Sequence, residues 1–144
     1  MAKIAIVLFL FFSSASQAQV VKPNESQKAA FKKLAAQSVL HVETSLKKLE
    51  QSGPLSDPAK IQSDVVQPAG QLVKEWQLEK LSDQVMSNYS ACSSILSDLQ
   101  VYAKDTIAPP KYHLATAAQQ KLRFIKEDLL ECKKLRSKVP AFDF

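Results

Sequence analysis

Two cysteines, Cys92 and Cys132, are the side chains whose types and spacing carry the clearest chemistry in this chain. Thiols pair into disulfides in oxidising compartments and stay reduced in the cytosol. Forty positions of chain separate the two residues, so in the loop-entropy model a bridge would stabilise the fold by roughly 4 kcal/mol. For a secreted chain we expect one disulfide between them, with two buried free thiols as the alternative.

The N-terminal segment predicts the compartment in which the cysteines are located. Lys3 is a short basic region, residues 4–12 are an apolar run, and residues 16–18 (Ser-Gln-Ala) have the small side chains that signal peptidase recognises. A membrane anchor is the alternative, but crossing a bilayer takes about 20 apolar residues, and this run has nine. We expect a signal peptide over residues 1–18, a single secreted domain over residues 19–144, and no integral membrane segment after cleavage.

Two N-glycosylation acceptor sequences, Asn24-Glu25-Ser26 and Asn88-Tyr89-Ser90, have meaning only in a chain that enters the secretory pathway. Asn24 lies in the approach to the first predicted helix, which it could also cap together with Gln27. Asn88 falls within a predicted helix, where a glycan would have to clear the neighbouring helices. Both asparagines are candidate glycosylation sites.

Residues for catalysis or metal binding lack their usual partners. His41 and His113 are the only histidines, and neither has a cysteine or carboxylate at ligand spacing. The chain has no Gly-x-Ser-x-Gly sequence, and its two glycines cannot form a glycine-rich phosphate loop. Paired acids such as Glu127-Asp128 lie where solvent-facing helical charges belong. We therefore expect no metal, no cofactor and no enzymatic activity.

The last predicted helix holds the densest group of basic residues. Its candidates for binding a polyanion, such as an anionic glycan, are Lys126, Lys133, Lys134 and Lys138. The alternative is structural, because cations near a helix C-terminus complement the helix dipole and nearby acids offset them. Removal of Lys3 lowers the formal net charge from +5 to +4, and the secreted address argues against nucleic acid as a partner.

Trp76 is the only tryptophan of the chain. A helical bundle whose helices splay can enclose an apolar ligand, and Trp76, close to the proline at position 68, could form a wall of such a pocket. Packing in the core is the simpler interpretation, because large aromatic side chains supply much of the buried area of a small domain.

Apolar residues recur at helical spacing throughout the mature chain, and no strand-like alternation competes with them. The first helix is predicted from Asn24 to about Gln51, and a second begins at Asp57-Pro58, which supplies a cap and a proline at the first helical position. Pro68 cannot donate a backbone hydrogen bond, so we expect a kink near residues 63–67.

The segment from residue 71 to residue 107 would be about 55 Å long as one helix, longer than the other predicted helices. We therefore expect a break between Lys80 and Asn88, with Ser82-Asp83 as the cap. A turn at residues 108–114 then leads to a last helix over residues 115–138. In the resulting hairpin, Cys92 and Cys132 come side by side, within the distance that a disulfide needs.

These elements predict an all-α, antiparallel bundle of about four helices, with three as the fallback, whose last two helices are joined by a disulfide. The predicted function is that of a small secreted, non-enzymatic protein that binds an extracellular protein or a polyanion. The alternative is a carrier that holds a small lipophilic ligand inside the bundle.

Overall fold

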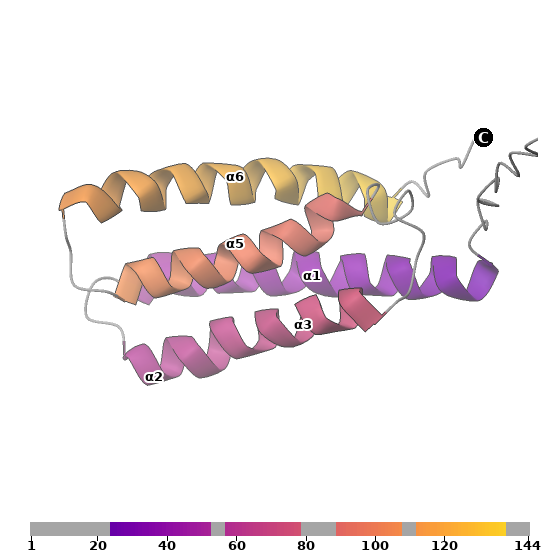
Figure 1. Cartoon of the computed structure of the whole chain (residues 1–144), viewed down its shortest axis with the longest axis horizontal. Helices are drawn as coiled ribbons and strands as arrows, with labels where there is room; N and C mark the ends of the chain where they lie inside the picture. The colour runs from indigo at the N-terminus through magenta and orange to yellow at the C-terminus, as the bar shows by residue number, and fades with distance from the viewer. Residues whose placement is uncertain (1–23, 53–56, 79–88, 108–111, 138–144) are drawn as a thin grey trace, which may run out of the picture.

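The computed structural model describes residues 24–52, 57–78, 89–107 and 112–137. Within these ranges four helical rods pack side by side, and rods that follow each other in the chain run in opposite directions (Figure 1). The rods are α1 (Glu25–Ser52), a second rod built from α2 (Pro58–Ile61), η2 (Gln62–Val66) and α3 (Gln67–Leu78), then α5 (Ser90–Ile107) and α6 (Tyr112–Ser137). The predicted all-α class and antiparallel four-helix bundle are confirmed.

The start of α1 is held by a reciprocal cap between Asn24 and Gln27. The Asn24 side-chain oxygen accepts a hydrogen bond from the Gln27 backbone N–H at 2.8 Å, and the Gln27 side-chain oxygen accepts one from the Asn24 backbone N–H at 2.9 Å. Two N–H groups that a helix start leaves without partners are thereby satisfied. The predicted cap is confirmed.

The second rod begins as predicted, and its helix changes geometry in the turn before Pro68. Asp57 caps it by accepting a hydrogen bond from the Ala59 N–H at 2.9 Å, and Pro58 is its first helical residue. The segment η2, directly before Pro68, is a π-helical turn. Because Pro68 lacks an N–H and its ring crowds the preceding turn, the helix widens at this point instead of ending.

The ends of the later helices agree with one prediction and correct another. α3 ends at Leu78 and α5 begins at Ser90, so the predicted break within residues 71–107 is confirmed, although its predicted cap at Ser82-Asp83 lies outside the described residues. α6 begins at Tyr112, three residues before the predicted start. A helix can start this close behind a proline pair because its first N–H groups have no intrahelical partners to lose.

The core contains a cluster of three aromatic rings from three rods. Phe31 of α1 lies with its ring centroid 6.2 Å from that of Trp76 of α3 and 5.3 Å from that of Tyr89, next to α5. All three side chains are at most 1 % exposed. The Trp76 indole N–H donates to the Ser38 hydroxyl at 3.0 Å, and that hydroxyl donates to the Leu34 carbonyl at 2.8 Å. The buried polar groups therefore have partners.

A disulfide joins Cys92 of α5 to Cys132 of α6, with their Cα atoms 4.9 Å apart. Both residues are fully buried, and the Cys132 sulfur also lies 3.9 Å from the Ala35 carbonyl oxygen of α1. The bridge lies near the start of α5 and toward the end of α6, at the opposite end of this helix pair from Ile107 and Tyr112. The predicted pairing and its position are confirmed.

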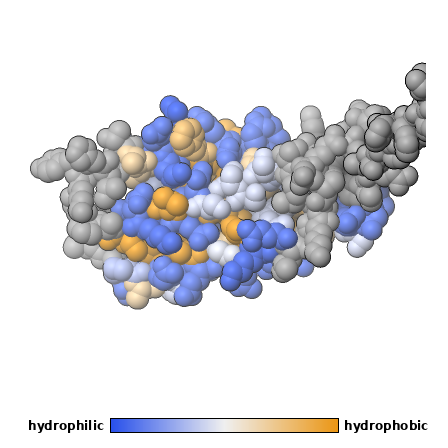
Figure 2. All heavy atoms as spheres, viewed as in Figure 1, coloured by the Kyte–Doolittle hydropathy of each residue, from blue (hydrophilic) through white to orange (hydrophobic). Residues whose placement is uncertain are grey.

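One face of the bundle can be followed in a space-filling view, and it is mostly hydrophilic (Figure 2). Figure 2 shows the face formed by α3, α5 and α6, on which hydrophobic side chains lie as small patches between polar ones. In the part of the chain that the structure describes, no helix is long and apolar enough to cross a bilayer. The predicted signal peptide and the C-terminal residues from 138 onward lie outside the described ranges.

Candidate functional site

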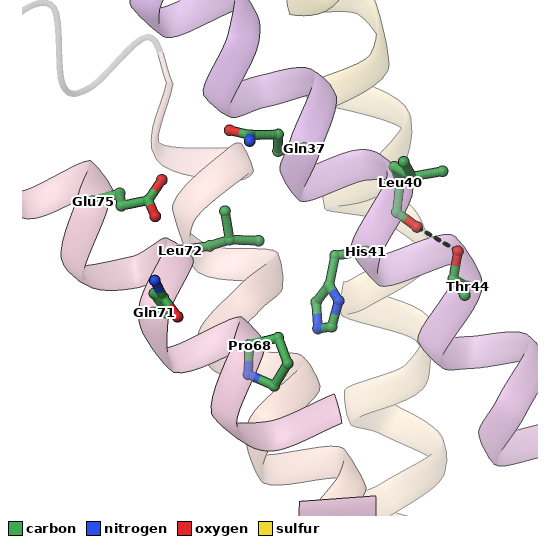
Figure 3. Close-up of a pocket in the computed structure, with 8 residues that line it drawn as sticks. All are labelled: Gln37, Leu40, His41, Thr44, Pro68, Gln71, Leu72 and Glu75. Atoms are coloured by element: carbon green, nitrogen blue, oxygen red, sulfur yellow. Dashed lines mark hydrogen bonds between the residues drawn. The ribbon is translucent and has the colours of Figure 1, made fainter. Parts of the chain in front are cut away.

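A surface groove of about 410 Å³ runs between α1 and α3 (Figure 3). We call it the α1–α3 groove. Its walls are one stripe of each helix, because residues three or four positions apart lie on the same face of a helix. The α1 wall consists of Gln37, Leu40, His41 and Thr44, and the α3 wall consists of Pro68, Gln71, Leu72 and Glu75.

The groove has an apolar middle and a polar end. The His41 ring and the Leu72 side chain point toward each other from the two walls, with Pro68 beside them (Figure 3). At one end Gln37 and Glu75 face each other across the opening. An apolar group with a polar neighbour could therefore be accommodated.

Leu40 extends the apolar surface beyond the groove. Its side chain points away from α3 over the outer edge of α1 (Figure 3), and 65 % of the residue is exposed. A single exposed leucine is common on protein surfaces, so the interest of Leu40 lies in its position at the rim of a groove that holds further apolar side chains.

His41 is the histidine that the structure describes with its side chain, and it is half-buried. Its Nε2 lies 3.1 Å from the carbonyl oxygen of Val65 in η2. A carbonyl can only accept a hydrogen bond, so Nε2 carries the proton. Burial lowers the pKa of His41 below 6.5, the nearby Lys48 cation lowers it further, and the hydrogen bond to Val65 opposes them. The imidazole in the groove wall is therefore neutral at pH 7.

The predicted basic residues of α6 are largely engaged in ion pairs. Lys133 lies 2.5 Å from the Glu43 carboxylate of α1, and Lys134 lies 2.6 Å from Glu131. Lys126 is exposed and forms no ion pair with the described residues. Lys138 lies outside the described residues. The structure thus leaves Lys126 alone among the described candidates as a cation without an acidic partner.

Two further cations of α6 are also paired. Lys121 lies 2.9 Å from Asp98 of α5, and Arg123 lies 3.5 Å from Glu127 one turn further along α6. Surface pairs of this kind contribute little to stability, but each one reduces the positive potential that a polyanion would meet.

The other predicted site residues are distributed over the molecule. Trp76 lies in the aromatic core and is also among the residues that line a hollow of about 270 Å³ between α3 and α5. Asn24 is exposed at the start of α1, and Asn88 lies outside the described residues. Among the residues that the structure describes, no three His, Cys, Asp or Glu side chains gather where they could hold a metal ion.

The α1–α3 groove was not predicted from the sequence, although one signal pointed to it. Leu40 lies off the apolar stripe of its helix: the nearby residues Val39 and Val42 are in the core, whereas Leu40 faces solvent. The sequence does not show which stripe of α3 lies against this side of α1, because periodicity describes each helix only by itself.

Comparison with known proteins gives no further guide. The chain matches no protein-family model, no curated protein and no solved structure.

Proposed function

We propose that this chain is a secreted protein that acts by binding another protein, with the α1–α3 groove as its contact surface. The observation that carries the proposal is the exposed Leu40 at the rim of a groove whose α3 wall holds the half-buried apolar residues Leu72 and Pro68. Exposed apolar surface with a polar rim is typical of protein interaction sites.

The shape of the groove favours a protein over a small lipophilic ligand. Sites for small molecules bury about 70–90 % of the ligand surface, whereas this groove of about 410 Å³ opens widely to solvent. An apolar side chain anchored on a larger partner needs no such enclosure, because the surrounding surfaces exclude water. Carriage of a small lipophilic ligand is the alternative function.

The groove is also a better candidate than the basic face of α6. Lys133 and Lys134 already have acidic partners, so binding a polyanion there would have to break or share these pairs. The apolar side chains of Leu72 and Pro68 form no ion pairs, so a partner that contacts them in the groove has no such pair to break. We therefore favour a protein partner over an anionic glycan.

Secretion is supported by two independent features. The predicted signal peptide over residues 1–18 supplies the address, and the Cys92–Cys132 disulfide is the bond that an oxidising compartment maintains. Entry into the secretory pathway also opens Asn24 and Asn88 to glycosylation.

Site-specific cross-linking tests the proposed contact surface. A photoreactive amino acid is placed at position 40 in the groove rim, and at position 130 of α6 in a control protein. Leu130 is 59 % exposed and Leu40 is 65 % exposed, so the two positions are matched in type and accessibility. Each protein is irradiated in the fluid into which the natural chain is secreted.

We expect a discrete protein adduct from position 40 that is absent from position 130. The adduct should be lost on Leu72→Asp and retained on Val101→Asp, a change at an exposed position of α5 outside the groove. Equal cross-linking from both positions would contradict the groove as the contact surface. A small molecule recovered by organic extraction, with no protein adduct, would favour the carrier function.

A further inference from the structure

We propose that Asn24 has two functions at once: its side-chain oxygen caps α1, and its side-chain nitrogen carries an N-linked glycan. The inference rests on the secretion that we propose above. It does not depend on the α1–α3 groove or on any partner.

The cap leaves the glycan acceptor atom free. Asn24 Oδ1 is occupied by the Gln27 N–H at 2.8 Å, and the Asn24 backbone N–H is occupied by the Gln27 side-chain oxygen at 2.9 Å. Neither hydrogen bond uses Nδ2, which is the atom that N-glycosylation modifies. The modified amide keeps its oxygen, so the cap and the glycan are chemically compatible.

The only group of this protein that reacts is the Asn24 amide. Nδ2 attacks the anomeric carbon of an oligosaccharide carried on a polyprenyl diphosphate, and a nitrogen–carbon bond forms. The carbon–oxygen bond to the diphosphate breaks, and its electron pair leaves with the polyprenyl diphosphate. One Nδ2 proton passes to a base of the oligosaccharide transferase, and nothing is oxidised or reduced. Ser26 completes the acceptor sequence that the transferase recognises.

The surroundings of Asn24 offer room for a large polar group. Asn24, Glu25 and Ser26 are all exposed, and the N-terminal turn of α1 projects past the neighbouring ends of α3 and α5 (Figure 1). Gln37, the nearest residue of the groove wall, is 13 positions further along α1, which is about 20 Å at 1.5 Å per residue. A glycan at Asn24 therefore leaves the groove open.

Two sets of variants separate the glycan from the cap. Ser26→Ala removes the acceptor sequence but keeps Asn24 and both capping bonds, and Ser90→Ala is the matched change in the other acceptor sequence. Asn24→Asp removes the acceptor nitrogen but keeps an oxygen that can cap, whereas Asn24→Ala removes both. The full chain is expressed in a eukaryotic secretory host, and protein is recovered from cells and medium.

The readouts are the intact mass before and after peptide N-glycosidase, and peptide mapping for the aspartate that this enzyme leaves at a modified position. We expect glycan at Asn24 in the wild type and in Ser90→Ala, and none at this position in Ser26→Ala. The thermal midpoint of deglycosylated protein should fall for Asn24→Ala and stay nearly unchanged for Asn24→Asp.

Unmodified Asn24 in protein from the medium would overturn the glycan and leave secretion standing. Protein that stays in the cell with its N-terminal segment uncleaved and Asn24 unmodified would overturn both. A glycan on Asn24 with equal thermal midpoints for Asn24→Ala and Asn24→Asp would overturn the capping function.

Discussion

Ser38 is the residue that lets a tryptophan be buried in this bundle. The Trp76 indole needs an acceptor for its N–H when it leaves water, and the Ser38 hydroxyl supplies one at 3.0 Å. The same hydroxyl donates its own proton to the Leu34 carbonyl at 2.8 Å. One small polar side chain thus satisfies both the indole and itself inside an apolar core, which explains why a serine occupies a fully buried position of α1.

Removal of this hydroxyl should therefore be costly. Ser38→Ala leaves the Trp76 N–H buried without a partner, and we expect the free energy of unfolding to fall by about 1–3 kcal/mol. Ser63→Ala, at an exposed position whose hydroxyl bonds only locally, should change it by less than about 0.5 kcal/mol. Urea unfolding followed by tryptophan fluorescence measures both, because Trp76 is the only tryptophan in the chain. Equal stability of the two variants would show that the hydrogen bond is dispensable.

At the scale of elements, the π-helical turn η2 depends on support from α1. His41 contacts the Val65 carbonyl at 3.1 Å, and Lys48 pairs with Asp64 at 3.1 Å. Both contacts connect α1 to η2, the turn that Pro68 distorts. The buried faces of Ile61, Val65 and Val66 continue across the turn, so the widened geometry keeps the second rod in register with the core.

The His41 contact predicts a pH dependence of stability. The pKa of His41 in the folded protein is below its ordinary value of 6.5, chiefly because of burial. As pH falls below 6.5 the unfolded chain therefore binds a proton that the folded protein does not, and stability is lost toward the lower folded pKa. Above 6.5 the contribution of His41 to stability is fully present.

We expect the free energy of unfolding to decrease from pH 7.5 to pH 5.5 more steeply in the wild type than in His41→Gln, which keeps an N–H donor but does not titrate. The measurement is a series of urea unfolding curves across this range. The carboxylate of Asp64, whose pKa is lowered mainly by its hydrogen bond with Lys48, is present in both proteins. Parallel pH profiles would contradict the proposed role of His41.

At the scale of the whole molecule, the disulfide closes a long stretch of chain around an already packed core. Its cysteines are 40 positions apart and fully buried. The described buried residues form one continuous cluster that includes both cysteines. The helices therefore pack through side chains as well as through the covalent bond.

Loss of the disulfide should weaken the bundle without changing its architecture. We expect the free energy of unfolding of the double variant Cys92→Ala with Cys132→Ala to be roughly 4 kcal/mol lower than that of the oxidised wild type, because the unfolded chain of the variant is less constrained. Urea unfolding measures the difference, and far-ultraviolet circular dichroism should report the same helical content in the folded states. Unchanged stability would mean that the bridge adds nothing beyond packing. Loss of all helical signal would mean that the core cannot form without it.

Most of the fold could be predicted from the sequence, because its determinants are local. The Asn24–Gln27 cap, the Asp57-Pro58 start and the distortion before Pro68 each depend on residues within one or two helical turns. The disulfide is between residues distant in sequence, but it followed from local information as well. The lengths of the two helices and the turn between them fixed the register that brings Cys92 beside Cys132.

The candidate site was decided by tertiary structure. The contact of His41 with Val65 spans 24 positions, and Lys133 pairs with Glu43 of a different helix. Neither follows from periodicity, which tells which face of a helix is apolar but not how that helix is rotated against its neighbours. The same rotation brings the stripes of Leu40 and Leu72 together as a groove. The sequence by itself thus determined the helices, their order and their covalent link, and the packing angles between helices determined which surface side chains meet.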